Sequence, residues 1–80
     1  MGQIRSGDLV RKLSDEHEWL RVDPWAETSA GVVFWREKTP VLVLEVYEGS
    51  DEHYKQIKVL TKAGIGWLYA SKVELVNKNK

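Results

Sequence analysis

Hydrophobic and polar residues alternate along much of the chain with the two-residue period of β-strands. The alternation is cleanest over residues 53–61, where it directs Ile57 and Val59 toward an interior and the polar residues next to them toward solvent. Residues 41–47 are almost continuously hydrophobic, which is typical of a strand covered on both faces. The pattern predicts an all-β protein with residues 41–47 in the middle of its sheet.

The C-terminal part of the chain predicts two strands joined by a tight connection. Gly64 and Gly66 mark the turn into the first of them, because glycine reaches positive φ and lets a neighbouring backbone come close. Alternation then directs Leu68 into the core. Residues 70–72 are too few for an α-helix, so we expect a single 3₁₀ turn before a last strand at residues 73–76.

The N-terminal half predicts one strand followed by a long hairpin arm. The strand covers residues 7–13, and the polar residues 14–18 after it form a loop or one helical turn, of which we expect the loop. Residues 19–22 and 32–35 have the composition of strands and form the two sides of the arm. We expect the interior of the sheet to be built around Leu44, Val59, Leu68 and Val73.

Length and composition indicate a single domain, residues 1–80, without covalent reinforcement. A chain of 80 residues buries only about 60 to 65 per cent of its unfolded surface, and we expect residues 1–6 and 77–80 to fray. The absence of cysteine excludes disulfides and thiolate metal sites. Twelve basic and twelve acidic residues provide no general attraction to nucleic acid or to an anionic membrane. Without a secretory signal or a membrane-spanning run, a cytoplasmic protein is predicted.

Residues 66–73 resemble the C-terminal signature of SH3-like barrels, in which a glycine, an aromatic and an aliphatic residue precede a short turn and a valine. The matching positions are Gly66, Trp67, Leu68 and Val73. Tyr69 and Lys72 stand where the signalling members of that family have the proline and tyrosine of their polyproline pocket. The resemblance therefore implies the fold, and it does not imply recognition of proline-rich peptides.

The chain is also similar to short SH3-like proteins of bacteriophages and bacteria, most of which have no assigned activity. The similarity lies in three sequence segments that occur in the same order: residues 7–11, residues 43–46 with 57–60, and residues 66–70. It implies a small five-stranded barrel with a long arm, of the RT-loop type, between the first two main strands and a 3₁₀ turn before the last. It also implies an accessory protein of phage origin in the host cytoplasm, whereas the expected role, a non-enzymatic binding or assembly module, is inferred from the aromatic residues described next.

Four tryptophans are many for eighty residues. A barrel of this size hides one or two indole rings completely, so the others should lie partly exposed. The residues that we expect to form an aromatic groove on the surface are Trp25, Trp35, Trp67 and Tyr69. Such a groove suits a peptide segment of a partner protein, a surface for self-association or a cationic ligand.

Basic residues near the last hairpin support an alternative function, nucleic-acid binding. The lysines concerned are Lys55, Lys58, Lys62 and Lys72. Lysines interleaved with aromatic rings can neutralise phosphates while the rings stack on bases, and residues 7–11 with 31–33 are faintly similar to KOW-type barrels. The balanced charge of the chain argues against this alternative, which we do not favour.

The sequence Ser-Asp-Glu-His occurs twice, at residues 14–17 and 50–53, each time ahead of a predicted strand. Imidazole and carboxylate groups can ligate a divalent cation, but neighbouring residues in a chain rarely converge on one ion, and we expect solvated loops without a metal. No nucleophile elbow, phosphate-binding glycine loop, dinucleotide fingerprint or zinc-ligand spacing is present. The protein is therefore predicted to be neither an enzyme nor a cofactor-binding protein.

Overall fold

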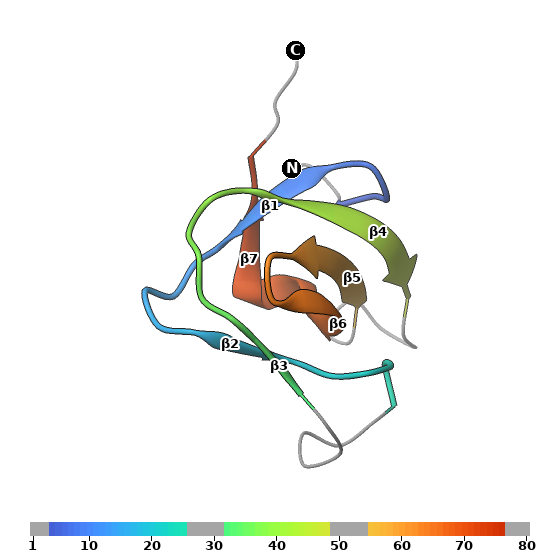
Figure 1. The fold of residues 1–80 in the computed structure, drawn as a ribbon. Helices are drawn as coiled ribbons and strands as arrows, with labels where there is room; N and C mark the ends of the chain where they lie inside the picture. Colours follow the sequence, from blue (N-terminus) through green and yellow to red (C-terminus); the bar gives the residue numbers. More distant parts are fainter. Residues whose placement is uncertain (1–3, 26–31, 49–54, 77–80) are drawn as a thin grey trace.

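The computed structural model describes residues 4–25, 32–48 and 55–76, and the secondary structure in this part of the chain is almost entirely β. A five-stranded antiparallel sheet with the order β6-β5-β4-β1-β7 lies beside a two-stranded ribbon of β2 and β3 (Figure 1). The elements are β1 (Leu9–Lys12), β2 (Glu18–Leu20), β3 (Val33–Trp35), β4 (Val41–Tyr47), β5 (Gln56–Thr61), β6 (Gly64–Tyr69), the 3₁₀ turn η2 (Ala70–Lys72) and β7 (Val73–Leu75). The predicted all-β class, the bounds of residues 41–47 and the 3₁₀ turn are confirmed.

Strand β4 holds the central position in the sheet, as the sequence predicts, but the outer face of its first part is open to solvent. Val41 and Val43 are buried, whereas Leu42 and Glu45 are exposed. The prediction of a strand covered on both faces is therefore wrong for residues 41–45, whose outward side chains are open to solvent, whereas at Tyr47 the ring of Trp25 packs on the outward side. The register between β4 and β5 also shifts between Val43 and Glu45, which leaves Leu44 only partly buried instead of in the core.

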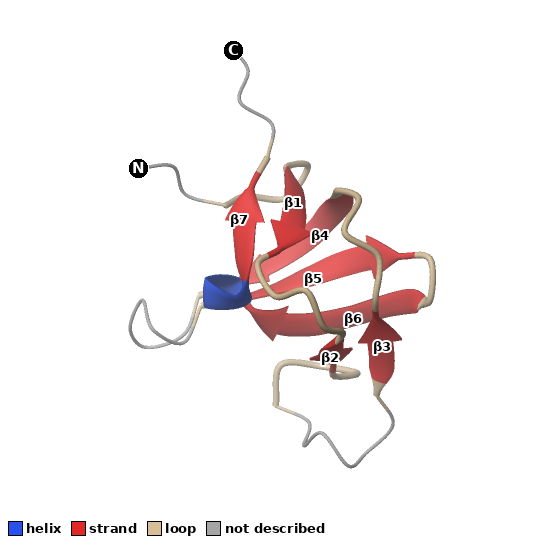
Figure 2. Ribbon diagram, turned by 90° about the vertical axis from the view of Figure 1, so that its left-hand side faces the viewer, coloured by secondary structure: helices blue, strands red, loops and turns tan. Residues whose placement is uncertain are grey.

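The core forms where the inner face of the sheet meets the arm. Its buried members are Val10, Leu20, Trp35, Val41, Val43, Ile57, Val59, Leu68 and Val73. The predictions for Val59, Leu68 and Val73 are confirmed. The two strands of the arm, β2 and β3, lie beside β6 (Figure 2). Leu20 and Trp35 come from these strands, so the arm supplies two of the large side chains that close the interior.

The arm is attached to the edge of the sheet through a close backbone approach at Gly66. The N–H of Arg21 donates to the carbonyl oxygen of Trp67 at 2.9 Å, and the N–H of Trp67 donates to the carbonyl oxygen of Arg21 at 2.8 Å. A Cβ atom at Gly66 would lie within 3.0 Å of the Cβ atom of Leu20. A glycine is therefore required where β6 passes under the arm, in agreement with the close approach inferred from the sequence.

The helical residues of the described ranges are confined to the short turn η2, and no helix there has the length and apolar character needed to cross a bilayer.

Candidate functional site

The four tryptophans divide into two buried and two exposed rings, as expected for so small an interior. Trp35 and Trp67 are 0% and 7% exposed, whereas Trp19 and Trp25 are 49% and 71% exposed. Trp35 belongs to the core because it points inward from β3. Trp67 lies on the opposite face of the sheet, where the ammonium group of Lys58 stands 5.9 Å from the centre of its ring. The predicted groove of four aromatic residues is thus wrong for these two rings, which are not accessible to a partner.

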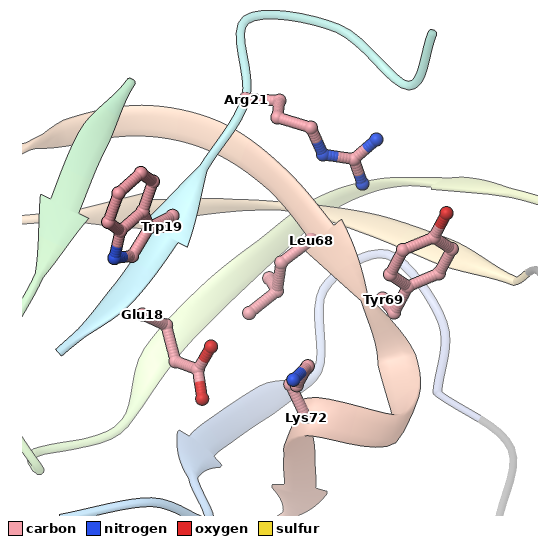
Figure 3. Close-up of a pocket in the computed structure, with 6 residues that line it drawn as sticks. All are labelled: Glu18, Trp19, Arg21, Leu68, Tyr69 and Lys72. Carbon is pink, nitrogen blue, oxygen red and sulfur yellow. The ribbon is translucent and has the colours of Figure 1, made fainter. Parts of the chain in front are cut away.

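A surface pocket with a volume of about 290 Å³ lies between the arm and the end of β6. It is lined by Glu18, Trp19, Arg21, Leu68, Tyr69 and Lys72. Figure 3 shows Leu68 in the middle of this group, with the residues of the arm on one side and Tyr69 and Lys72 on the other. The pocket therefore has an apolar floor, two aromatic residues in its walls and charged groups at its rim.

The rim beside Tyr69 is held by a network centred on Arg21. Its guanidinium group donates from Nη1 to the carbonyl oxygen of Pro24 at 3.1 Å and from Nη2 to Oε1 of Gln56. The Nε2 atom of Gln56 donates to the same Pro24 oxygen at 2.9 Å. The guanidinium carbon also lies 5.0 Å from the centre of the Tyr69 ring, within the range of a cation–π interaction. This network orients Tyr69 and explains why Gln56, which alternation directs toward solvent, is buried.

Two charged side chains at the pocket have no ionic partner in the described part of the chain. These are the carboxylate of Glu18, at the start of β2, and the ammonium group of Lys72, at the end of η2. Elsewhere, several charges are paired, as in Glu45 with Lys58 at 3.3 Å. An unpaired carboxylate and an unpaired ammonium group beside one apolar floor can each form a charge-assisted hydrogen bond to a ligand.

Trp19 is held in place by a cluster of rings on the outer side of the arm. It pairs with Phe34 across the ribbon, with the ring centres 5.4 Å apart in an edge-to-face arrangement. His17 lies against both, at 5.1 Å from the Phe34 ring and 6.2 Å from the Trp19 ring. The sequence analysis missed Trp19 as a site residue, although alternation from the buried Leu20 places its neighbour on the outer face.

The two remaining predicted aromatic residues, Trp25 and Tyr69, are both accessible, but only Tyr69 lines the pocket. Trp25 packs edge to face on Tyr47, with the ring centres 5.3 Å apart. The sheet register places Tyr47, Gln56 and Tyr69 in one row across three strands. Trp25 and the pocket thus occupy opposite ends of that row.

The four lysines of the alternative prediction, nucleic-acid binding, have different environments. Lys55 is paired with Glu48 at 3.8 Å and Lys58 with Glu45 at 3.3 Å. Lys62 is exposed, and Lys72 belongs to the pocket. The two ion pairs reduce the positive charge that this surface presents to a phosphate backbone.

The two Ser-Asp-Glu-His loops were considered as possible metal sites. Among the described residues, no three His, Cys, Asp or Glu side chains lie close enough together to hold an ion. In the first loop, Asp15 is paired with Lys38 at 3.1 Å, and Ser14 Oγ accepts the N–H of Glu16 at 2.9 Å. The second loop, residues 50–53, lies outside the described residues.

Comparisons with protein-family models, with curated proteins and with solved structures find no match for this chain. The function of the pocket is therefore inferred from its own side chains and their contacts.

Proposed function

We propose that the protein is a non-enzymatic binding module with an SH3-like barrel fold, and that its pocket holds a side chain from an extended segment of a partner protein. Three features support the fold. They are the strand order β6-β5-β4-β1-β7, the arm between β1 and β4, and the 3₁₀ turn between β6 and β7. The assignment to a bacteriophage and to the host cytoplasm stays a prediction from sequence resemblance.

The observation that carries the binding proposal is the combination of an apolar floor with two unpaired charges of opposite sign. Leu68 forms the floor, and Glu18 and Lys72 stand beside it without ionic partners in the described ranges. At about 290 Å³ the pocket is at the lower end of the range for small-molecule sites, which is about 300–1,000 Å³. This size suits one or two side chains of a peptide better than a large cofactor.

The chemistry of the rim specifies the kind of peptide. An aliphatic or aromatic side chain would pack on Leu68 between the rings of Trp19 and Tyr69. A basic residue on one side of it would meet the carboxylate of Glu18, and an acidic residue on the other side would meet Lys72. The proposed ligand is therefore a short extended segment in which a hydrophobic residue lies between opposite charges.

A peptide titration followed by NMR of the ¹⁵N-labelled protein tests this proposal. The probes are short peptides with a central leucine flanked by arginine and aspartate in both orders, and a matched peptide with a central serine. We expect one charge order to bind best, with a Kd between about 1 μM and 1 mM, and the amide shifts to centre on Leu68 and Tyr69. Replacing the leucine should abolish the shifts.

Charge-reversal variants sharpen the test. Glu18→Lys combined with Lys72→Glu should invert the preferred charge order, whereas Lys62→Glu on the β5–β6 turn should leave it unchanged. Peptides that bind both proteins equally, or that shift no pocket residue, would contradict the proposal. Binding of single-stranded or duplex oligonucleotides that weakens steeply with salt would instead support the nucleic-acid alternative.

A further inference from the structure

Four aliphatic side chains form a row across the outer face of the sheet, away from the pocket. Leu9 of β1 lies opposite Leu42 of β4, Leu42 lies opposite Leu60 of β5, and Leu60 lies opposite Ile65 of β6. All four are between 37% and 48% exposed. Because neighbouring strands are about 4.8 Å apart, the row extends over about 14 Å.

The row is a property of the pairing register and not of any one strand. Each strand contributes one residue, which alternation places on the face opposite the core, and the register aligns the four residues. Outward positions of a solvated sheet are usually polar, as at Glu45 and Lys58 on the same face. An aligned run of aliphatic residues on such a face is typical of an interaction surface.

We propose that this aliphatic row is the contact surface of a homodimer, in which the row of one copy packs face to face on the row of a second copy. Two copies related by a twofold axis present the same patch to each other, so the patch must be compatible with itself in shape and in charge.

The charges beside the row meet this requirement. Arg11 and Glu74 form an ion pair at 2.6 Å on one side, and Glu45 and Lys58 form one at 3.3 Å on the other. Each pair is neutral, so two copies of the patch do not repel each other as they would if it carried a net charge. A nucleic acid or an anionic membrane would instead require an excess of positive charge, which these pairs do not provide.

The area that a dimer needs is a modest share of the protein's whole surface. A stable interface buries about 800 Å² on each partner, which is about one sixth of the accessible surface of 5142 Å². An apolar centre formed by the row with ion pairs around it has the organisation of such an interface. The pocket remains free, because Ile65 and Tyr69 lie at opposite ends of β6.

Sedimentation equilibrium or light scattering from about 10 μM to about 1 mM protein tests the proposal over the range of weak and moderate dimers. The mass of the wild-type protein should rise from 9.2 kDa toward twice that value. Leu42→Lys and Leu60→Lys should each raise the dimer Kd about tenfold or more, because an ammonium group would be buried without a partner. Ile65→Thr, which keeps a strand-forming residue, should raise it about threefold.

The matched control is Leu13→Lys, the same substitution at a residue that is 54% exposed but lies outside the row. It should leave the dimer Kd unchanged. Urea midpoints measured below the Kd should be similar for all variants, since each replaced side chain points outward. A wild-type mass of 9.2 kDa throughout the range, or equal weakening by Leu13→Lys and Leu60→Lys, would overturn the proposal.

Discussion

The attachment of the arm to the sheet makes a quantitative prediction for Gly66→Ala. The added Cβ atom would lie within 3.0 Å of the Leu20 Cβ, 3.1 Å from the Arg21 carbonyl oxygen and 3.3 Å from the Leu20 carbonyl carbon. All three neighbours belong to the backbone or are bonded directly to it, so no side-chain rotation relieves the clash. The arm must therefore move away from β6 or the core must deform.

The expected cost follows from the contacts that this movement disturbs. Overpacking of a core costs about 1–3 kcal/mol, and weakening the two hydrogen bonds between Arg21 and Trp67 adds about 1–2 kcal/mol. The loss of glycine's freedom in the unfolded chain offsets about 0.5–1 kcal/mol. We expect a net loss of about 2–4 kcal/mol, which is a large part of the stability of about 4–12 kcal/mol typical of an 80-residue domain.

Urea unfolding followed by tryptophan fluorescence measures this loss, because Trp35 leaves the core when the arm detaches. With a slope of about 1 kcal/mol/M, the midpoint should fall by about 2–4 M. Gly7→Ala is the matched control, since Gly7 has a φ of 93° and nothing within 4 Å of its Cβ position. That variant incurs only backbone strain, about 1–2 kcal/mol. A Gly66→Ala midpoint equal to or above that of Gly7→Ala would refute the steric argument.

Two further predictions concern charges beside the core. Lys12 is fully buried, and its ammonium group donates to the Ser14 carbonyl oxygen at 3.3 Å. Because a buried charge is costly to desolvate, Lys12→Met should raise the free energy of unfolding by about 1 kcal/mol in the same assay. A lower urea midpoint for this variant would contradict the prediction. Burial raises the pKa of Glu37, but the net effect of its surroundings is to lower that pKa below its ordinary value of 4.5. The lowering comes from hydrogen bonds with the N–H groups of Lys62 and of Glu37 itself, and from the positive charges of Lys62 and Lys12. Its stabilising effect is therefore present above pH 4.5 and lost as the pH falls through the folded-state pKa. Glu37→Gln should flatten the loss of stability below pH 4.5, and an unchanged pH profile would exclude this role.

The strands and the 3₁₀ turn could be read from the sequence because the signals that define them are local. Residues 41–47 and 70–72 have the predicted bounds, and the arm appears as β2 and β3 within one residue or two of its predicted sides. Alternation also identified Val59 and Leu68 as core residues, since a strand that has one buried face must place every second side chain on it.

The alternation of hydrophobic and polar residues could not predict which of the tryptophans is buried. Trp19 and Trp35 lie in the two strands of one ribbon, and alternation alone does not say which face of that ribbon meets the sheet. Leu20 and Trp35 point inward because the ribbon closes on the sheet beside Gly66. Trp19 is thereby turned outward, toward the pocket.

By itself, the sequence determined the all-β class, the order of the elements and part of the core, Ile57, Val59, Leu68 and Val73, because each depends on the spacing of neighbouring residues. Tertiary structure alone decided the pocket and the aliphatic row. Glu18 and Arg21 meet Leu68 only after the arm has docked. The row from Leu9 to Ile65 exists only in the pairing register of four strands. Both features depend on contacts between residues that are distant in the chain, and those contacts are set by how the strands pair and pack.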